Sequence, residues 1–163
     1  MRPYEIARQY IGQTEKPGNM GFTDVEFERK MQKVGFQKTH AWCAYFTELV
    51  FKEAYPERLA ELDKLFSAST IQTFRNFRDA GHLIGNVPQL DALVIWQRIR
   101  YGSPQPFGHA GVVSKVIDVH TFKSIEGNTN DEGGPEGYIV AEKDRKVQLK
   151  VPNGLKLLGF ITV

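Results

Sequence analysis

The first half of the chain carries apolar residues at intervals of three and four, which places them on one face of a helix. This pattern predicts helices over residues 3–11, about 23–34, about 40–55, 56–66 and 69–81. The segment 40–55 is apolar on most of its sides, so we expect it to form the central helix of the fold.

Residues typical of helix ends support these boundaries. Thr23–Glu26 has the sequence of a capping box, and Phe22 and Phe27 are placed to form a hydrophobic staple around it. Gly35 is suited to end that helix, and Thr39 is a candidate N-cap of the central one.

The second half changes to short β-branched or alternating runs separated by Gly, Pro, Asn and Asp. These runs predict strands at Asp91–Trp96, His109–Ile117, Thr121–Glu126, Tyr138–Lys143, Lys146–Val151 and Leu157–Val163. Helices followed by strands indicate an α+β fold with N-terminal helices packed on a C-terminal antiparallel sheet. No repeat divides the chain, and the loop Arg98–Gly108 is too short for an interdomain linker, so we expect one domain over residues 1–163.

The composition narrows the functional classes. With 163 residues, 41% hydrophobic and 25% charged, the chain is typical of a globular domain. The formal net charge is only +2 and no basic arm is present, so we expect no nucleic-acid partner. No apolar run approaches the ~20 residues of a membrane span, and the N-terminus lacks the apolar core of a signal peptide. We therefore expect a soluble protein made in the cytoplasm, without a membrane partner.

The chain has a single cysteine, Cys43, at the start of the predicted central helix. One cysteine excludes an internal disulfide and a multi-cysteine zinc site. The helix dipole favours a thiolate in a first turn by only about 0.3–1 kcal/mol, so a nucleophile also needs a basic partner. On position alone, a buried apolar role is the better interpretation of Cys43.

The predicted strands offer that partner. His109 begins one strand and Glu126 ends the next, so a hairpin between them would make the two side chains neighbours. A nucleophilic thiol needs a base, and the base needs a group that orients it. Cys43, His109 and either Glu126 or Asn128 form such a set, although each is individually explained as an ordinary core or surface residue.

Three segments, Ala41–Phe46, Gly108–Val113 and Glu126–Thr129, resemble in order the motifs of the CHAP family, the cysteine- and histidine-dependent amidohydrolases/peptidases. Ile11–Asn19 and Glu132–Gly137 are also similar to segments of phage and prophage members, so the resemblance extends over nearly the whole chain. It implies a papain-like fold and hydrolysis of amide bonds in peptidoglycan.

The resemblance also implies a role for each site residue. Cys43 corresponds to the nucleophile, His109 to the general base, Glu126 to the group that orients the imidazole, and Asn128 to an auxiliary polar residue. Trp42, next to the thiol, is a candidate for packing and for substrate binding. Attack by the thiolate would give a thioester, with a backbone N–H near Cys43 as an oxyanion donor.

The chain departs from the family pattern at a few places. Tyr45 and Thr47–Glu48 replace smaller or β-branched residues, and Ser103–Pro106 resembles an insertion at the cleft rim. No calcium-binding cluster precedes Cys43, and the acidic segment Asn130–Gly133 is better interpreted as a solvated turn than as a metal site. We therefore expect no cofactor and no metal.

Three hypotheses remain open for the function. The leading one is a monomeric, cysteine-dependent amidase or endopeptidase whose partner is peptidoglycan, delivered to the cell wall by a holin, by injection or on a virion. The second is an effector that modifies a protein carboxamide, such as a deamidase. The third is a phage-particle wall-binding module without activity. A metalloenzyme is disfavoured because no histidine pair has i,i+4 spacing.

Overall fold

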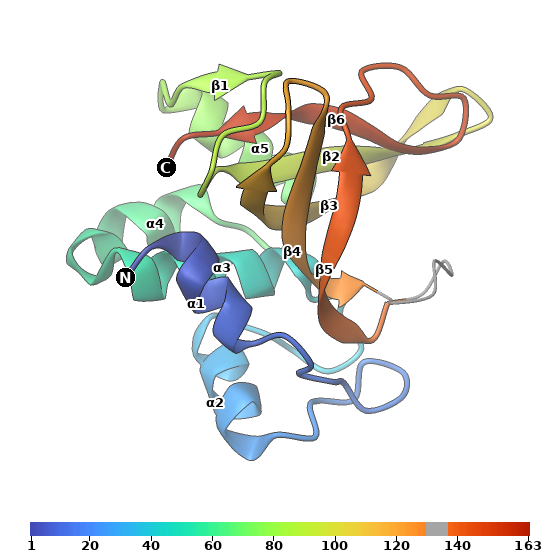
Figure 1. The fold of residues 1–163 in the computed structure, drawn as a ribbon. Helices are drawn as coiled ribbons and strands as arrows, with labels where there is room; N and C mark the ends of the chain where they lie inside the picture. Colours follow the sequence, from blue (N-terminus) through green and yellow to red (C-terminus); the bar gives the residue numbers. More distant parts are fainter. Residues whose placement is uncertain (130–136) are drawn as a thin grey trace.

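The computed structural model describes residues 1–129 and 137–163, with the helices gathered on one side of a curved sheet (Figure 1). The helices are α1 (Pro3–Gln9), α2 (Val25–Lys33), α3 (Cys43–Ala54), the 3-10 turn η1 (Pro56–Arg58), α4 (Leu59–Leu65) and α5 (Thr70–Asp79). The strands are β1 (Ile84–Gly85), β2 (Leu93–Arg100), β3 (Ser103–Val116), β4 (Thr121–Thr129), β5 (Ile139–Lys146) and β6 (Gly154–Ile161). The predicted α+β class is confirmed.

The described residues form one six-stranded sheet in the order β1-β6-β2-β3-β4-β5, with every neighbouring pair antiparallel. Two predictions about this region are wrong. Arg98–Gly108 is not a loop, because β2 and β3 continue pairing until Arg100 meets Ser103. The segment 147–151 is not a strand but connects β5 to β6. Its backbone makes isolated hydrogen bonds, from Val147 N–H to the carbonyl of His120 and from Leu157 N–H to the carbonyl of Gln148, instead of a continuous strand ladder.

The start of α2 differs from the predicted capping box by one residue. Asp24, not Thr23, is the N-cap, and its side chain accepts a hydrogen bond of 2.8 Å from the backbone N–H of Phe27. The predicted contact between Phe22 and Phe27 is confirmed, with ring centroids 4.7 Å apart. Gly35, at φ 93°, follows the end of the helix as expected.

The central helix α3 begins at Cys43, three residues later than about His40. Thr39 does not cap it, because Thr39 has a left-handed φ of 74° and its N–H is bonded to the carbonyl of Asn19. The chain thus turns before the helix starts, and Cys43 becomes its first residue.

Two apolar clusters cover the two faces of the sheet. Leu93 and Ile95 of β2 belong to the larger cluster, which also contains the buried face of α3. Val94 and Trp96, the alternate residues of the same strand, belong to a smaller cluster on the opposite face with Phe122. The strand alternation therefore builds both cores, and α3 is held on β3 and β4 by the larger one.

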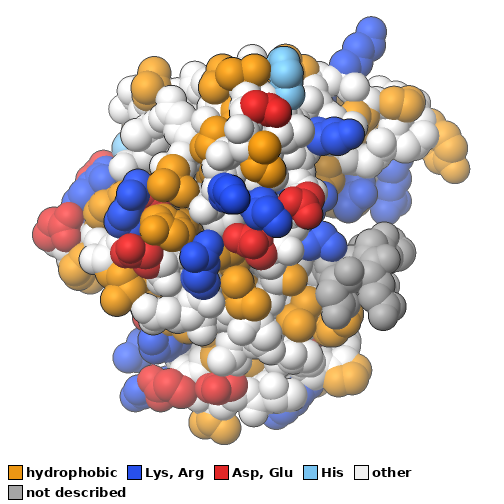
Figure 2. Space-filling view, viewed as in Figure 1, with side chains coloured by type: hydrophobic (Ala, Val, Ile, Leu, Met, Phe, Trp, Pro, Cys, Tyr) orange, Lys and Arg blue, Asp and Glu red, His pale blue; other side chains and the backbone are white. Residues whose placement is uncertain are grey.

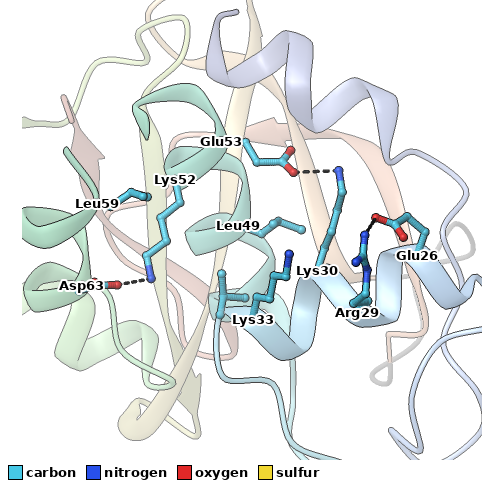
Figure 3. A pocket seen from close by; sticks show the side chains of 10 residues that line it. Glu26, Arg29, Lys30, Lys33, Leu49, Lys52, Glu53, Leu59 and Asp63 are labelled. Carbon is cyan, nitrogen blue, oxygen red and sulfur yellow. Dashed lines mark hydrogen bonds and ion pairs between the residues drawn. The ribbon is translucent and has the colours of Figure 1, made fainter. Parts of the chain in front are cut away.

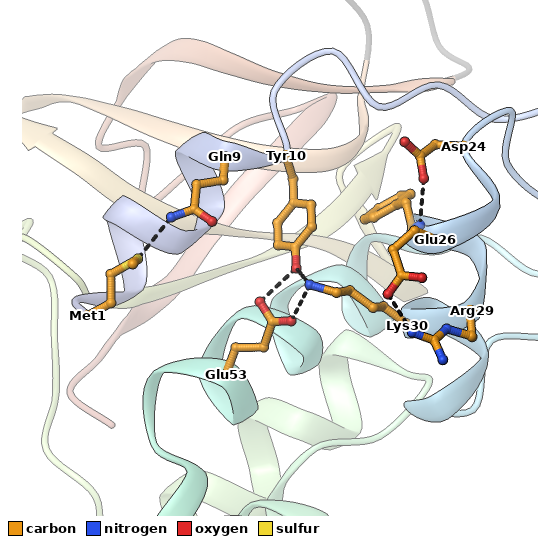
Figure 4. Close-up of polar contacts among 9 residues, drawn as sticks. Met1, Gln9, Tyr10, Asp24, Glu26, Arg29, Lys30 and Glu53 are labelled. Atoms are coloured by element: carbon orange, nitrogen blue, oxygen red, sulfur yellow. Dashed lines mark hydrogen bonds and ion pairs between the residues drawn. The ribbon is translucent and has the colours of Figure 1, made fainter.

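A polar contact joins three of the helices. The Tyr10 hydroxyl donates to Glu53 at 2.7 Å, and Lys30 donates to both Tyr10 and Glu53, at 2.8 and 2.9 Å (Figure 4). Burial and then the Glu53 carboxylate raise the pKa of Tyr10 to about 12. The phenol thus stays neutral and ties α1, α2 and α3 together.

Acidic and basic side chains are intermixed over the face shown in Figure 2, as expected for a chain with a net charge of +2. Within the described residues, none of the helices has the length and apolar character needed to span a membrane.

Candidate active site

Cys43, His109 and Glu126 come from three separate elements that meet at one end of α3. The helix packs on β3 and β4, and the pairing of Val112 with Ile125 brings the middle of β3, where His109 lies, beside the end of β4. The predicted proximity of His109 and Glu126 is confirmed: His109 Nε2 lies 2.8 Å from Glu126 Oε2.

The thiol of Cys43 is hydrogen-bonded to the His109 side chain. Since Nε2 of the imidazole is taken by Glu126, Nδ1 is the ring nitrogen left to face the sulfur. Cys43 is 5% exposed, and both Cys43 and His109 line the same cleft. The three side chains therefore form one continuous hydrogen-bonded chain from carboxylate to thiol.

Glu126 is fully buried and its carboxylate is surrounded by donors. Ser124 Oγ donates to Oε1 at 2.5 Å, and Arg145 donates from Nε to Oε1 at 2.7 Å and from Nη2 to Oε2 at 2.5 Å. Burial alone would raise the pKa of Glu126, but Arg145 and His109 outweigh it and lower this pKa to about 2. The carboxylate is therefore charged at neutral pH.

This fixed charge acts on His109. Burial opposes the charged imidazole, but the Glu126 carboxylate and the hydrogen bond with Cys43 outweigh burial and raise the pKa of His109 to about 9. The imidazole thus holds a proton at neutral pH, and a protonated histidine beside a sulfur stabilises the thiolate.

Glycines on β3 and β4 make room for this arrangement. A Cβ at Gly111 would lie 2.8 Å from Glu126 Cγ, and a Cβ at Gly127 would lie 2.6 Å from Phe46 Cβ. Both distances are shorter than real Cβ contacts, so these positions require glycine for the carboxylate to sit against β3 and for α3 to approach β4.

Sequence reasoning assigned no role to Arg145 and Ser124. Ser124 lies two residues before Glu126 on β4, so strand alternation was a signal that both point to the same face. Arg145 reaches that face because β5 pairs Arg145 with Phe122, a register that local sequence does not specify. The Arg145 guanidinium also lies over the Trp96 ring, 5.2 Å from its centroid, and this ring stacks on His109 at 5.8 Å.

Of the two roles expected for Trp42, packing and substrate binding, the structure shows the packing role. Its side chain has no exposed surface and packs edge-on against Phe22, with its Nε1–H donating to Glu15 at 2.7 Å. A buried indole has no surface to offer a substrate, whereas Glu15 does line the cleft. Trp42 is therefore a packing residue that holds Glu15 at the cleft.

Asn128, the fourth predicted site residue, lines the cleft with Cys43 and His109. It has a left-handed φ of 53°, a conformation in which asparagine is favoured over most residues, and lies where the pairing of β4 with β5 is irregular. Among the described residues, Glu126 and not Asn128 is hydrogen-bonded to Nε2 of His109.

The cleft has a volume of about 620 Å³ and opens between α3, the β2–β3 hairpin and the loop that precedes α2. In addition to Cys43 and His109, it is lined by Glu15, Gly18, Asn19, Ala41, Arg98, Ile99, Arg100, Phe107, Gly108, Asn128, Gly137, Asn153 and Gly154. His40 is not among these lining residues; it is exposed and hydrogen-bonded to the Tyr45 hydroxyl at 3.1 Å.

Comparison with known proteins gives no independent assignment. No protein-family model matches the chain, and no curated protein matches it. Any functional proposal therefore depends on the motifs and on the geometry of the site.

Two further predictions concern acidic groups. The segment Asn130–Gly133 and most of the Glu132–Gly137 motif lie outside the described residues. Within residues 1–129 and 137–163, no three His, Cys, Asp or Glu side chains are grouped so that they could hold a metal ion.

Proposed function

We propose that this protein is a cysteine-dependent amidohydrolase or peptidase of the CHAP type, with a papain-like fold, that hydrolyses amide bonds of peptidoglycan. The observation that carries the proposal is the hydrogen-bonded chain from Glu126 through His109 to Cys43, which ends at a cleft. A nucleophile, a base and an orienting carboxylate in this order are the elements of acyl transfer through a thioester.

The geometry supports a definite order of proton transfers. In the reactive pair the Cys43 thiol has given its proton to His109, whose pKa, raised to about 9, favours the imidazolium. The Cys43 sulfur attacks the carbonyl carbon, and the tetrahedral intermediate collapses as His109 gives its proton to the leaving amine. His109 then removes a proton from water, which attacks the thioester and releases the acid. Glu126 stays ionised throughout and keeps the imidazole in place.

Oxyanion stabilisation is available at the start of α3. Cys43 is the first residue of this twelve-residue helix, and the side chain of its N-cap residue, Trp42, makes no capping hydrogen bond. The first backbone N–H groups of a helix have no intrahelical acceptor, so they are free to donate to an oxygen that becomes negatively charged beside the sulfur.

The substrate class is supported by the motifs. Ala41–Phe46, Gly108–Val113 and Glu126–Thr129 resemble those of peptidoglycan hydrolases. The cleft of about 620 Å³ is within the usual size range of small-molecule and peptide sites.

The test is mass spectrometry of the products released from purified peptidoglycan by wild type, Cys43→Ala and Arg75→Gln. Arg75 is exposed on α5 and serves as a matched surface control. We expect cleavage by wild type and Arg75→Gln only, with new amine and carboxyl ends in the fragments. Cleavage that survives Cys43→Ala would overturn the proposal.

The reactivity of the thiol provides a second measurement that needs no substrate. We expect iodoacetamide to alkylate Cys43 at neutral pH at least tenfold faster in wild type than in His109→Gln. The variant lacks the imidazolium that stabilises the thiolate. Fast alkylation without cleavage of any cell wall, but with ammonia release from a protein substrate, would favour the deamidase hypothesis instead.

A further inference from the structure

Two arginines of β2 line the same cleft as the catalytic pair. Trp96, whose ring stacks on His109, is followed two residues later by Arg98 and four residues later by Arg100. Arg98 is half-buried in the cleft wall, while Arg100 is exposed and lies over the Phe107 ring, 5.5 Å from its centroid. The mechanism proposed above uses neither guanidinium.

Arg98 is a half-buried cation without a described counter-charge. Among residues 1–129 and 137–163, no carboxylate lies within ion-pair distance of its guanidinium. Burial and then the like charges of Arg100 and Arg145 lower the pKa of Arg98. Holding a cation under these conditions costs free energy unless a ligand neutralises it.

A second charged groove, among the described residues of the helices, shows the opposite arrangement. Between α2, α3 and α4, Lys30 pairs with Glu53 at 2.9 Å and Lys52 with Asp63 at 2.5 Å (Figure 3). Arg29 pairs with Glu26 at 2.7 Å in the same groove. The partly buried cations of that groove, Lys30 and Lys52, are neutralised within the protein, and Lys33, which has no ion pair among the described residues, is exposed to solvent. That groove therefore presents no comparable demand for an anionic ligand.

The carboxylates near the cleft are already engaged. Arg145 is neutralised by Glu126, with two hydrogen bonds. Glu15 is the only carboxylate residue among the described residues that line the cleft, and its Oε2 accepts the indole N–H of Trp42. The positive charge of Arg98 and Arg100 is therefore available to a bound molecule.

We propose that Arg98, assisted by Arg100 at the rim, binds a free carboxylate of the substrate close to the scissile amide. The substrate class is then an anionic peptide rather than its carboxamide form. A guanidinium matches a carboxylate with two parallel hydrogen bonds, which a neutral amide cannot accept in the same way. This inference rests on the proposed function and specifies which peptidoglycan peptides the site prefers.

The experiment compares two forms of one substrate. Purified peptidoglycan is used either directly or after its carboxyl groups have been converted to amides with a carbodiimide and ammonia. Initial rates are measured for wild type, Arg98→Gln, Arg98→Lys and the surface control Arg75→Gln. We expect amidation to lower kcat/KM of wild type and Arg75→Gln by about ten- to a hundredfold, the range for a charged hydrogen-bonded pair.

Arg98→Gln should lose a similar factor on the untreated substrate, mainly through KM, and should no longer distinguish the two forms. Arg98→Lys should keep part of the preference, because it retains the charge but not the planar fork. The melting temperatures of Arg98→Lys and Arg98→Gln should be no lower than that of wild type, because the Arg98 guanidinium has no ion-pair partner among the described residues to lose.

The outcomes separate the two proposals. If wild type cleaves neither form, the proposed function fails. If wild type cleaves both forms equally and Arg98→Gln has wild-type kinetics, the function stands and the carboxylate site is overturned. A melt lowered by several degrees in Arg98→Gln, with an unchanged substrate preference, would show that Arg98 is structural and would also overturn it.

Discussion

The guanidinium of Arg145 holds both oxygens of the Glu126 carboxylate, with Nε 2.7 Å from Oε1 and Nη2 2.5 Å from Oε2. Glu126 is fully buried, so this pairing keeps a charge in the interior next to His109. Arg145 contacts neither the thiol nor the cleft, and it acts through the carboxylate as a positioning residue.

We predict that Arg145→Met lowers kcat at least tenfold and destabilises the fold by about 3–5 kcal/mol, the cost of breaking a buried pair. Without the guanidinium, burial raises the pKa of Glu126 and weakens its hold on the imidazole. Arg145→Lys should recover part of both losses. The kinetics should be measured well below the melting temperature of each variant. A loss of activity that follows only the folded fraction, with an unaltered pH profile, would assign Arg145 a purely structural role.

The pH dependence of catalysis should follow His109. With its pKa raised to about 9, kcat/KM should fall as the pH rises through 9, because His109 loses the proton that the leaving amine needs. The double variant Glu126→Gln/Arg145→Met removes the carboxylate without leaving a buried guanidinium unpaired. Its alkaline limb should move to lower pH, since the Glu126 charge no longer offsets the effect of burial on the imidazole. An alkaline limb at the same pH in both proteins would contradict the assignment of this limb to His109.

The same two groups make stability depend on pH with opposite signs. The pKa of His109 is raised from 6.5, so its contribution is complete below pH 6.5 and is lost as the pH rises through 9. The pKa of Glu126 is lowered from 4.5, so its contribution is complete above pH 4.5 and is lost as the pH falls toward 2. The melting-temperature difference between wild type and His109→Gln should therefore shrink from pH 6.5 to pH 10. A difference that grows over this interval would reverse the predicted sign.

Gly111 is expected to be essential for the position of Glu126. A Cβ at residue 111 would lie 2.8 Å from Glu126 Cγ, so Gly111→Ala should displace the carboxylate and lower kcat by an order of magnitude or more. Gly85→Ala on β1 is the matched control, since a Cβ there meets nothing within 4 Å. The measurement is the kcat of both variants from steady-state kinetics. Equal kcat values for Gly111→Ala and Gly85→Ala would mean that catalysis tolerates a displaced Glu126 carboxylate.

Trp42 should affect stability more than substrate binding. Trp42→Phe removes the hydrogen bond to Glu15 and part of a fully buried ring, which should cost about 1–3 kcal/mol of unfolding free energy. We expect KM to change by less than about threefold, because the indole has no exposed surface. Chemical denaturation and kinetics on one sample would test both expectations. A tenfold rise in KM without loss of stability would restore the substrate-binding hypothesis.

The parts of the site that the amino-acid sequence predicted are those set by local rules. His109 and Glu126 flank one hairpin, and in a hairpin the register follows from a short turn, so their proximity can be inferred without the rest of the fold. Cys43 lies in an apolar helical segment, and the helix pattern predicted that segment correctly. Its exact first residue was missed because the left-handed Thr39 is held by Asn19, a contact between separate loops.

The remaining features depend on pairings between segments that are distant in sequence. Arg145 faces Glu126 only because β5 adds to the edge of β4 in one particular register, and Trp42 is buried only because the loop before α2 covers it with Phe22. Arg98 becomes part of the cleft because β2 and β3 continue beyond the predicted strand ends. Local patterns state which residues prefer helix or strand. Which charges meet in the interior, and which remain open to a ligand, is determined by the packing of the whole chain.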